Sequence, residues 1–153
     1  EFKSLYTFYY SGFNIRSTDF NANIGIHQLK KIKKITKIRF KDFLTYKKNL
    51  GNFWSQKSKL NVISSFGYAT FVSNRLAVYK YLKSKKIDSR PLICGNMGQQ
   101  PFLKKDFIKS KNLFNAKFVD KYGLYLPNHA SLNKKDIDFI SKSFNQIAKP
   151  INF

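Results

Sequence analysis

An asparagine and an arginine near the start of the chain have the spacing of an anion-binding pair. Asn14 and Arg16 are two residues apart, and in an extended segment this spacing points both side chains to the same side. Gly12, just before them, permits a sharp turn. Thr18 is a good helix N-cap, and Asp19 places negative charge at the positive end of the helix dipole. The pattern predicts a helix that begins near residue 18, preceded by two donor side chains that can meet an anion.

A second polar segment, residues 90–101, follows a predicted strand and contains two glycines, two prolines and several amides. Polar groups on loops at the ends of strands commonly contact ligands. An ordinary glycine turn is the alternative interpretation. The segment is therefore a candidate binding loop on physical grounds, with no ligand assigned by the residues themselves.

Other reactive side chains form no recognisable constellation in the sequence. We find no nucleophile–base pair, paired carboxylates, phosphate-binding loop or metal cluster. His129 precedes the last predicted helix, where a capping or core role is weighed against a catalytic one, and His27 is interpreted as structural. Cys94 is the single cysteine, so it forms no internal disulfide and favours a reducing compartment.

The formal net charge of +21 over 153 residues raises the possibility of a nucleic-acid partner. The basic residues are spread along the whole chain, and 25 of the 29 are lysine. Reading of base edges and stacking on aromatic rings favour arginine instead. We interpret the bias as that of an A/T-rich genome and expect no specific nucleic-acid partner, while a small basic nucleic-acid-binding domain stays an alternative. The positive field would attract phosphate-bearing substrates.

Hydrophobic periodicity predicts an α/β fold that begins with one long helix over residues 18–50. Its apolar positions recur every three or four residues, and they are Ile24, Leu29, Ile32, Ile35, Ile38, Phe43 and Leu44. Lysines and one arginine occupy the other face, which we interpret as solvated. No run of 18 apolar residues suggests a membrane span, and we expect no membrane partner.

Three strands and three further helices are predicted after the long helix. The strands are expected at residues 63–72, 87–91 and 124–127. A helix capped by Ser73 or Asn74 should bury a stripe of Leu76, Tyr79 and Leu82, and a short helix should end at Gly123. The last helix is predicted over 134–148, with Asn133 and Asp136 in a near capping box.

The two polar segments carry a family resemblance. Residues 12–19, G-F-N-I-R-S-T-D, followed by I-G-I-H-Q-L at 24–29, resemble the motif that opens the second half of the DegT/StrS family of sugar-nucleotide aminotransferases and dehydratases. These are fold-type I pyridoxal phosphate enzymes. The resemblance continues to about residue 147 and covers nearly all of this chain, but only the C-terminal part of the family's length. The chain begins with Glu1 rather than Met, which we interpret as a cut start.

The resemblance implies a division of the chain into three parts. Residues 1–17 would end the large cofactor domain, 18–50 would form a long interdomain helix, and 51–153 would form a small C-terminal α/β domain with a mixed sheet. It also implies a homodimer, in which Asn14 reaches across the interface to the cofactor phosphate of the neighbouring subunit.

The second segment resembles one branch of the family more than the other. Its R-P-x-x-x-G-N pattern at 90–96 is similar to the 3-dehydratases of 4-keto-6-deoxy sugar nucleotides, whereas aminotransferases tend to carry an H-Y-x-P-x-H type segment. The resemblance implies that Arg90 and Asn96 bind the nucleotide-sugar substrate. A sugar-nucleotide aminotransferase remains the alternative.

The cofactor implied by the resemblance is pyridoxal 5'-phosphate or pyridoxamine 5'-phosphate. It needs an aspartate, a stacking aromatic ring, a phosphate-holding serine, and a Schiff-base lysine or the histidine that replaces it in dehydratases. The resemblance places all of these upstream of Asn14. No catalytic residue is therefore assigned in this chain, which we expect to be inactive alone. The implied setting is deoxysugar and lipopolysaccharide biosynthesis in the cytoplasm.

Overall fold

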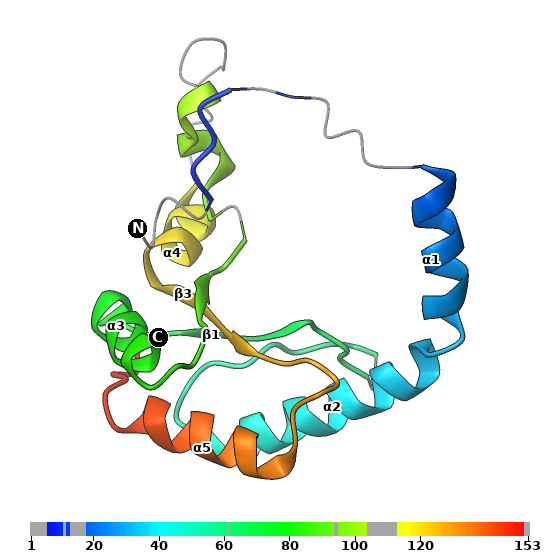
Figure 1. The fold of residues 1–153 in the computed structure, drawn as a ribbon. Helices are drawn as coiled ribbons and strands as arrows, with labels where there is room; N and C mark the ends of the chain where they lie inside the picture. The colour runs from blue at the N-terminus through cyan, green and yellow to red at the C-terminus, as the bar shows by residue number, and fades with distance from the viewer. Residues whose placement is uncertain are drawn as a thin grey trace.

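A small three-stranded sheet organises the structure, a computed structural model that describes residues 6–10, 12, 18–60, 62–93, 95–103 and 113–151. The strands are β1 (Gly67–Phe71), β2 (Arg90–Pro91) and β3 (Gly123–Pro127). Their order is β1-β3-β2, so the last strand in the sequence lies in the middle (Figure 1). The prediction of an α/β fold is confirmed, and the three predicted strands are present, β1 and β2 in shorter form and β3 one residue longer.

Both strand pairings in the described part of the chain are antiparallel. The resemblance implied a mixed sheet, and this detail is wrong for these residues. β1 and β2 run in the same direction, but β3 lies between them and runs the opposite way, so no parallel pair forms. Tyr68 faces Leu126 in the register of β1 with β3, and Arg90 faces Tyr125 in the register of β2 with β3.

Two helices pack side by side beneath the sheet and enclose the core (Figure 1). They are α2 (Ile32–Asn49) and α5 (Lys134–Asn145). Tyr46 of α2 stacks on Tyr68 of β1 with ring centroids 4.9 Å apart, and its hydroxyl donates to the carbonyl of Pro127 at 2.8 Å. Phe144 of α5 is fully buried in the same cluster. The core therefore joins both helices to the sheet through large aromatic side chains.

The predicted long helix is two helices, α1 (Asp19–Leu29) and α2, interrupted at Lys30 and Lys31. The amide of Lys31 donates to the carbonyl of Gln28 at 2.9 Å, a tighter turn than the α-helical pattern. Lysines at 30, 31, 33 and 34 place like charges three and four residues apart, which destabilises a continuous helix. The apolar period alone did not reveal this break.

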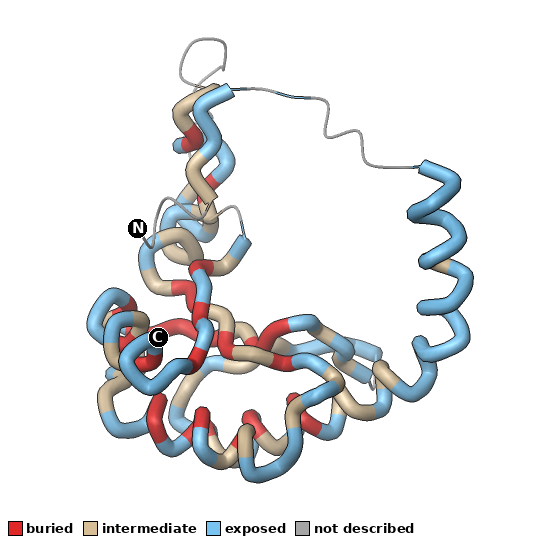
Figure 2. The backbone as a smooth tube through the Cα atoms, viewed as in Figure 1, coloured by how far each residue is buried: buried red, intermediate tan, exposed pale blue. Residues whose placement is uncertain are grey.

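α1 extends away from the sheet and buries none of its residues (Figure 2). Apolar side chains that the period placed on a buried face are exposed here, Ile24 and Leu29 among them. On α2, Phe43 is buried as predicted, but Leu44 is exposed and Tyr46 takes the buried position instead. Of the seven apolar positions predicted for the buried face, only Phe43 is buried, and Ile35 and Ile38 are partly covered.

Side-chain N-caps were predicted for three helices, and two of them are present. The Thr18 hydroxyl accepts from the Asn21 amide, and Asn133 with Asp136 forms a complete capping box at the start of α5. Asn74, the N-cap of α3 (Arg75–Ser84), makes no capping bond. Its side chain instead donates to the carbonyl of Ile147 and accepts from the amide of Lys149. The asparagine thus ties α3 to the end of the chain.

The buried stripe of α3 also differs from the prediction. Arg75, Val78 and Leu82 are buried, whereas Leu76 is exposed and Tyr79 only partly covered. Arg75 is buried because its guanidinium donates to the carbonyl of Gly123 at the start of β3. With Arg75 bonded to this main-chain carbonyl, the buried face of α3 differs from the face that the apolar pattern predicted.

The remaining elements are short helices around the second polar segment. They are the 3-10 turns η2 (Met97–Gln99) and η3 (Pro101–Leu103), followed by α4 (Phe114–Tyr122), whose last residue is followed directly by β3. α4 confirms the short helix predicted before Gly123. Within the described residues, no helix has the length and apolar character that a membrane crossing needs.

Candidate functional site

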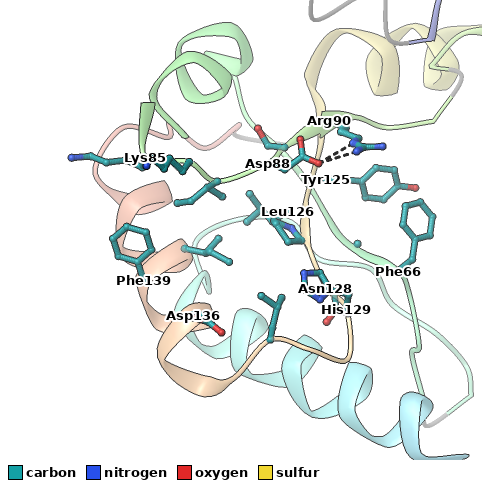
Figure 3. A pocket seen from close by; sticks show the side chains of 17 residues that line it. Phe66, Lys85, Asp88, Arg90, Tyr125, Leu126, Asn128, His129, Asp136 and Phe139 are labelled. Carbon is teal, nitrogen blue, oxygen red and sulfur yellow. Dashed lines mark hydrogen bonds and ion pairs between the residues drawn. The ribbon is translucent and has the colours of Figure 1, made fainter. Parts of the chain in front are cut away.

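A cleft of about 550 Å³ opens beside β2 and β3 (Figure 3). Its walls are the connection from α3 to β2, the end of β3, and the first half of α5. Apolar side chains such as Leu126, Leu132 and Ile140 line its interior, and the aromatic rings of Phe66 and Tyr125 lie 5.2 Å apart beside Arg90. The cleft combines an apolar surface with charged groups at its mouth, which is typical of a small-molecule site.

Arg90, predicted to bind substrate, lies at this cleft with its side chain about half exposed. Its guanidinium contacts the Asp88 carboxylate at 3.0 Å through Nη2 and donates to it at 3.1 Å through Nε (Figure 3). Hydrogen bonds to Asp88 and to Tyr6 raise the pKa of Arg90 above its usual value. The group is therefore a permanent cation, oriented by one carboxylate and accessible to a second anion.

Asn96, the other predicted substrate residue, lies in a different place. It lines a smaller cavity of about 210 Å³ with Gln100 and Asp120. Its side-chain oxygen accepts from the amide of Gly98 at 3.1 Å, while its buried Nδ2 has no hydrogen-bond partner among the described residues. The structure therefore separates Arg90 and Asn96 into two cavities joined by the loop between them.

Glycine is required at position 95, directly before Asn96. Gly95 has a φ of +44°, and a Cβ atom there would collide with the Asp120 carboxylate. The glycine thus lets the loop pass close to α4 and turn Asn96 inward. This specific requirement favours a shaped loop over an ordinary surface turn.

Asn14, the predicted cofactor residue, lies outside the described residues, as do Arg16 and Cys94. The segment on either side of it is described at residues 6–10, at 12 and from 18 onward. Its assigned contact with a cofactor phosphate therefore stays a prediction.

His129 is neither a core residue nor a helix cap, which corrects that interpretation, whereas the structural role of His27 stays a prediction. His27 is exposed, and its Nδ1 lies 3.0 Å from the carbonyl of Asn23 in its own helix. His129 is exposed at the cleft, and the N-cap position of α5 belongs to Asn133. His129 also helps to lower the pKa of Asp42, although burial has the larger effect and leaves that pKa raised.

Asp42 should make the stability of the fold depend on pH. Burial raises its pKa above the unfolded value of 3.8, and Lys41 and His129 only partly offset this. The folded state then binds more protons than the unfolded state, so stability falls as pH rises from 3.8 through the raised pKa. We expect Asp42→Asn to remove this loss and to raise the unfolding midpoint near neutral pH.

The measurement is denaturant unfolding at several pH values, with Asp138→Asn as the control. Hydrogen bonds from Asn49 and Lys134 lower the pKa of Asp138, so its contribution has the opposite sign and is lost as pH falls. Asp138→Asn should therefore reduce stability at neutral pH. Equal behaviour of the two variants across this range would contradict the role given to Asp42.

The sequence did not single out several residues that complete the two cavities. Asp88 fixes Arg90, Asp120 faces Asn96, and the Gln100 side chain is almost fully buried between segments far apart in the chain. Gln100 belongs to the predicted binding loop, but the sequence did not indicate that its side chain would bond to a distant segment. Nothing in the local pattern around Asp120 indicated that α4 would face that loop.

The chain resembles known proteins over nearly all of its length. The model of the DegT/DnrJ/EryC1/StrS aminotransferase family matches residues 2–145. Among curated proteins, the GDP-4-keto-6-deoxy-D-mannose 3-dehydratase of Escherichia coli O55:H7 is 26% identical over 149 residues, which are 92% of this chain and 38% of that protein. The enzyme with the same description from Yersinia pseudotuberculosis is 26% identical over 137 residues, covering 84% of this chain and 35% of that protein.

A solved structure gives the same result for the fold. The structure of the E. coli GDP-4-keto-6-deoxy-D-mannose-3-dehydratase with bound hydrated PLP aligns with a TM-score of 0.73 at 25% identity. The alignment covers 94% of this chain and 39% of that one. The chain thus spans less than two-fifths of the length of the relatives that it matches.

Proposed function

The chain belongs to the DegT/DnrJ/EryC1/StrS aminotransferase family, and from this premise we propose that it forms the C-terminal portion of a 3-dehydratase. The substrate is a 4-keto-6-deoxy nucleotide sugar, and the cofactor is pyridoxal phosphate or pyridoxamine phosphate. The observation that carries the proposal is Arg90, which opens the dehydratase-like R-P-x-x-x-G-N segment and lies exposed at the mouth of the cleft. The identity of 26% to a 3-dehydratase over 92% of the chain supports it.

Arg90 is suited to the diphosphate of a nucleotide sugar. A guanidinium offers parallel donors that match phosphate oxygens, and such contacts are stronger than neutral hydrogen bonds. Asp88 contacts Nε and Nη2 of this group and thereby fixes its orientation. The neighbouring rings of Phe66 and Tyr125 add an apolar surface for the rest of the ligand.

The described residues do not themselves form a site for the cofactor. The family resemblance places the groups that hold the cofactor ring, its phosphate and the Schiff base upstream of Asn14, outside the described residues. We therefore derive no catalytic step from this part of the chain and assign it to substrate binding.

The complete protein in this proposal is a homodimer that acts in the cytoplasm, in deoxysugar and surface-polysaccharide synthesis. The dimer is supported by the implied role of Asn14, which needs a second subunit. The cytoplasmic location is the setting that the family resemblance implies. The family match favours this enzyme over a small basic nucleic-acid-binding domain.

Sugar amination is the second candidate, because the matching family is described as one of aminotransferases. The two reactions are separated by mass spectrometry of the product. The complete protein would be supplied with the cofactor, an amino donor and a GDP-linked 4-keto-6-deoxy sugar. Loss of the 3-hydroxyl oxygen supports the dehydratase, and gain of an amine at the keto carbon supports the aminotransferase. Neither product would contradict both assignments.

Substitution of Arg90 should act mainly on substrate binding. Hydrogen bonds to a charged group contribute about 1.5–3 kcal/mol, so Arg90→Ala should raise the KM for the nucleotide sugar about ten- to a hundred-fold. Arg90→Lys should recover only part of this, since lysine lacks the paired donors. Lys85→Ala is the control, because it removes a cation from the same cleft. Equal effects of Arg90→Ala and Lys85→Ala would contradict a specific contact.

A further inference from the structure

The N-terminal segment is paired with the loop around Gln100. The Nε2 of Gln100 donates to the carbonyl of Tyr6 at 2.8 Å, and its Oε1 accepts from the amide of Phe8 at 2.9 Å. The amide of Phe102 donates to the carbonyl of Phe8 at 3.1 Å. Figure 1 shows residues 6–10 running beside η2 and η3. Three hydrogen bonds thus join segments separated by more than 90 residues.

Gln100 is suited to this contact by both its chemistry and its position. A primary amide carries a donor and an acceptor, so one side chain can satisfy a carbonyl and an amide two residues apart on an extended segment. The residue is only 8% exposed, which makes its hydrogen bonds costly to lose. Its neighbour Gln99 is exposed and lacks this arrangement.

Tyr6 makes a second connection from the same segment. It lies in the wall of the smaller cavity together with Pro91, the residue after Arg90. Asn96 lines the same cavity. Residues 6–8 therefore lie against two parts of the predicted substrate loop, near Pro91 and near Asn96. Along the chain, this segment precedes Asn14.

We propose that Gln100 is a positioning residue that fixes the segment leading into Asn14 against the loop that carries Arg90 and Asn96. Residues 6–8 and the loop around Gln100 then form one unit through these hydrogen bonds, and the chain that leads to the predicted cofactor residue starts from that unit. These hydrogen bonds are present whatever the protein does. Their effect on substrate and cofactor binding, however, rests on the proposed function.

The contact is tested by amide hydrogen exchange in the complete protein. Gln100→Met keeps the length of the side chain but removes its donor and acceptor, so the Phe8 amide should exchange about ten-fold faster or more. Gln99→Met is the matched control and should leave this exchange unchanged. An unchanged rate at Phe8 in Gln100→Met would overturn the proposal at the level of the contact, whatever the activity of the protein.

The positioning role is tested by cofactor affinity and steady-state kinetics of the same variants. Gln100→Met should weaken cofactor affinity and raise the KM for the nucleotide sugar, each about three- to ten-fold, while the thermal midpoint stays close to that of Gln99→Met. Faster exchange at Phe8 with unchanged cofactor affinity and KM would overturn the positioning role. Absence of any sugar-nucleotide activity in the unsubstituted protein would instead contradict the proposed function, and cofactor affinity would then decide the role of Gln100.

Discussion

Replacement of Phe144 by alanine is expected to lower the free energy of unfolding by about 3–5 kcal/mol, the usual cost of deleting a buried aromatic ring. The side chain is fully buried between α5, α2 and the sheet. Its ring also packs edge-on against Phe53 with centroids 4.9 Å apart. Removal of the ring leaves a cavity that both helices border, so the neighbouring side chains cannot easily fill it. Denaturant unfolding followed by circular dichroism would measure the loss.

Phe139→Ala is the matched control for this prediction. It removes the same ring from the same helix, but Phe139 is 51% exposed at the cleft. Surface substitutions usually change stability by less than about 0.5 kcal/mol, so Phe139→Ala should stay near the stability of the unchanged protein. Similar losses for both variants would show that helix propensity, rather than burial in the core, determines the result.

Asn14→Ala in the complete protein is expected to weaken cofactor affinity about ten- to a hundred-fold. The predicted contact is one hydrogen bond from the side-chain amide to a charged phosphate, worth about 1.5–3 kcal/mol. The phosphate keeps its other donors, so the loss of affinity should be partial. Titration of the apoprotein with pyridoxal phosphate measures the change. An unchanged affinity would contradict the role assigned to Asn14.

Mixing of two inactive variants tests whether the Asn14 contact crosses the dimer interface. Asn14→Ala would be combined with a variant inactivated at the Schiff-base lysine or its replacing histidine. If Asn14 serves the partner's site, each heterodimer contains one site with both defects and one with neither, and activity should return. Heterodimers that form without any recovery of activity would show that Asn14 acts in its own subunit or not at all.

The features predicted best from the sequence are those determined by neighbouring residues. Thr18 caps α1 and Asn133 with Asp136 forms the capping box of α5, because a cap depends on residues within one turn. The strands were recognised for a similar reason, since alternation within five residues is local. The family resemblance was also predictable, as it rests on short contiguous motifs.

The features that were missed depend on contacts between distant segments. Arg75 is buried because of a carbonyl 48 residues away, and no pattern within α3 indicates that acceptor. Gln100 likewise gains its partners from Tyr6 and Phe8. The separation of Arg90 from Asn96 arises from the turn at Gly95 and the approach of Asp120, which brings α4 against the loop. Sequence spacing alone placed these two side chains in one site.

The central position of β3 has a consequence for the order of assembly during synthesis. In the described sheet, β1 and β2 pair only with β3 and not with each other. Neither earlier strand can form its ladder until residues 123–127 have left the ribosome, and the sheet closes over long loops, which slows folding. Until then β1 has no hydrogen-bonding partner within the described sheet. The nascent chain therefore presents an unpaired strand edge from the synthesis of β1 until β3 emerges, a period in which chaperone binding would protect it from aggregation.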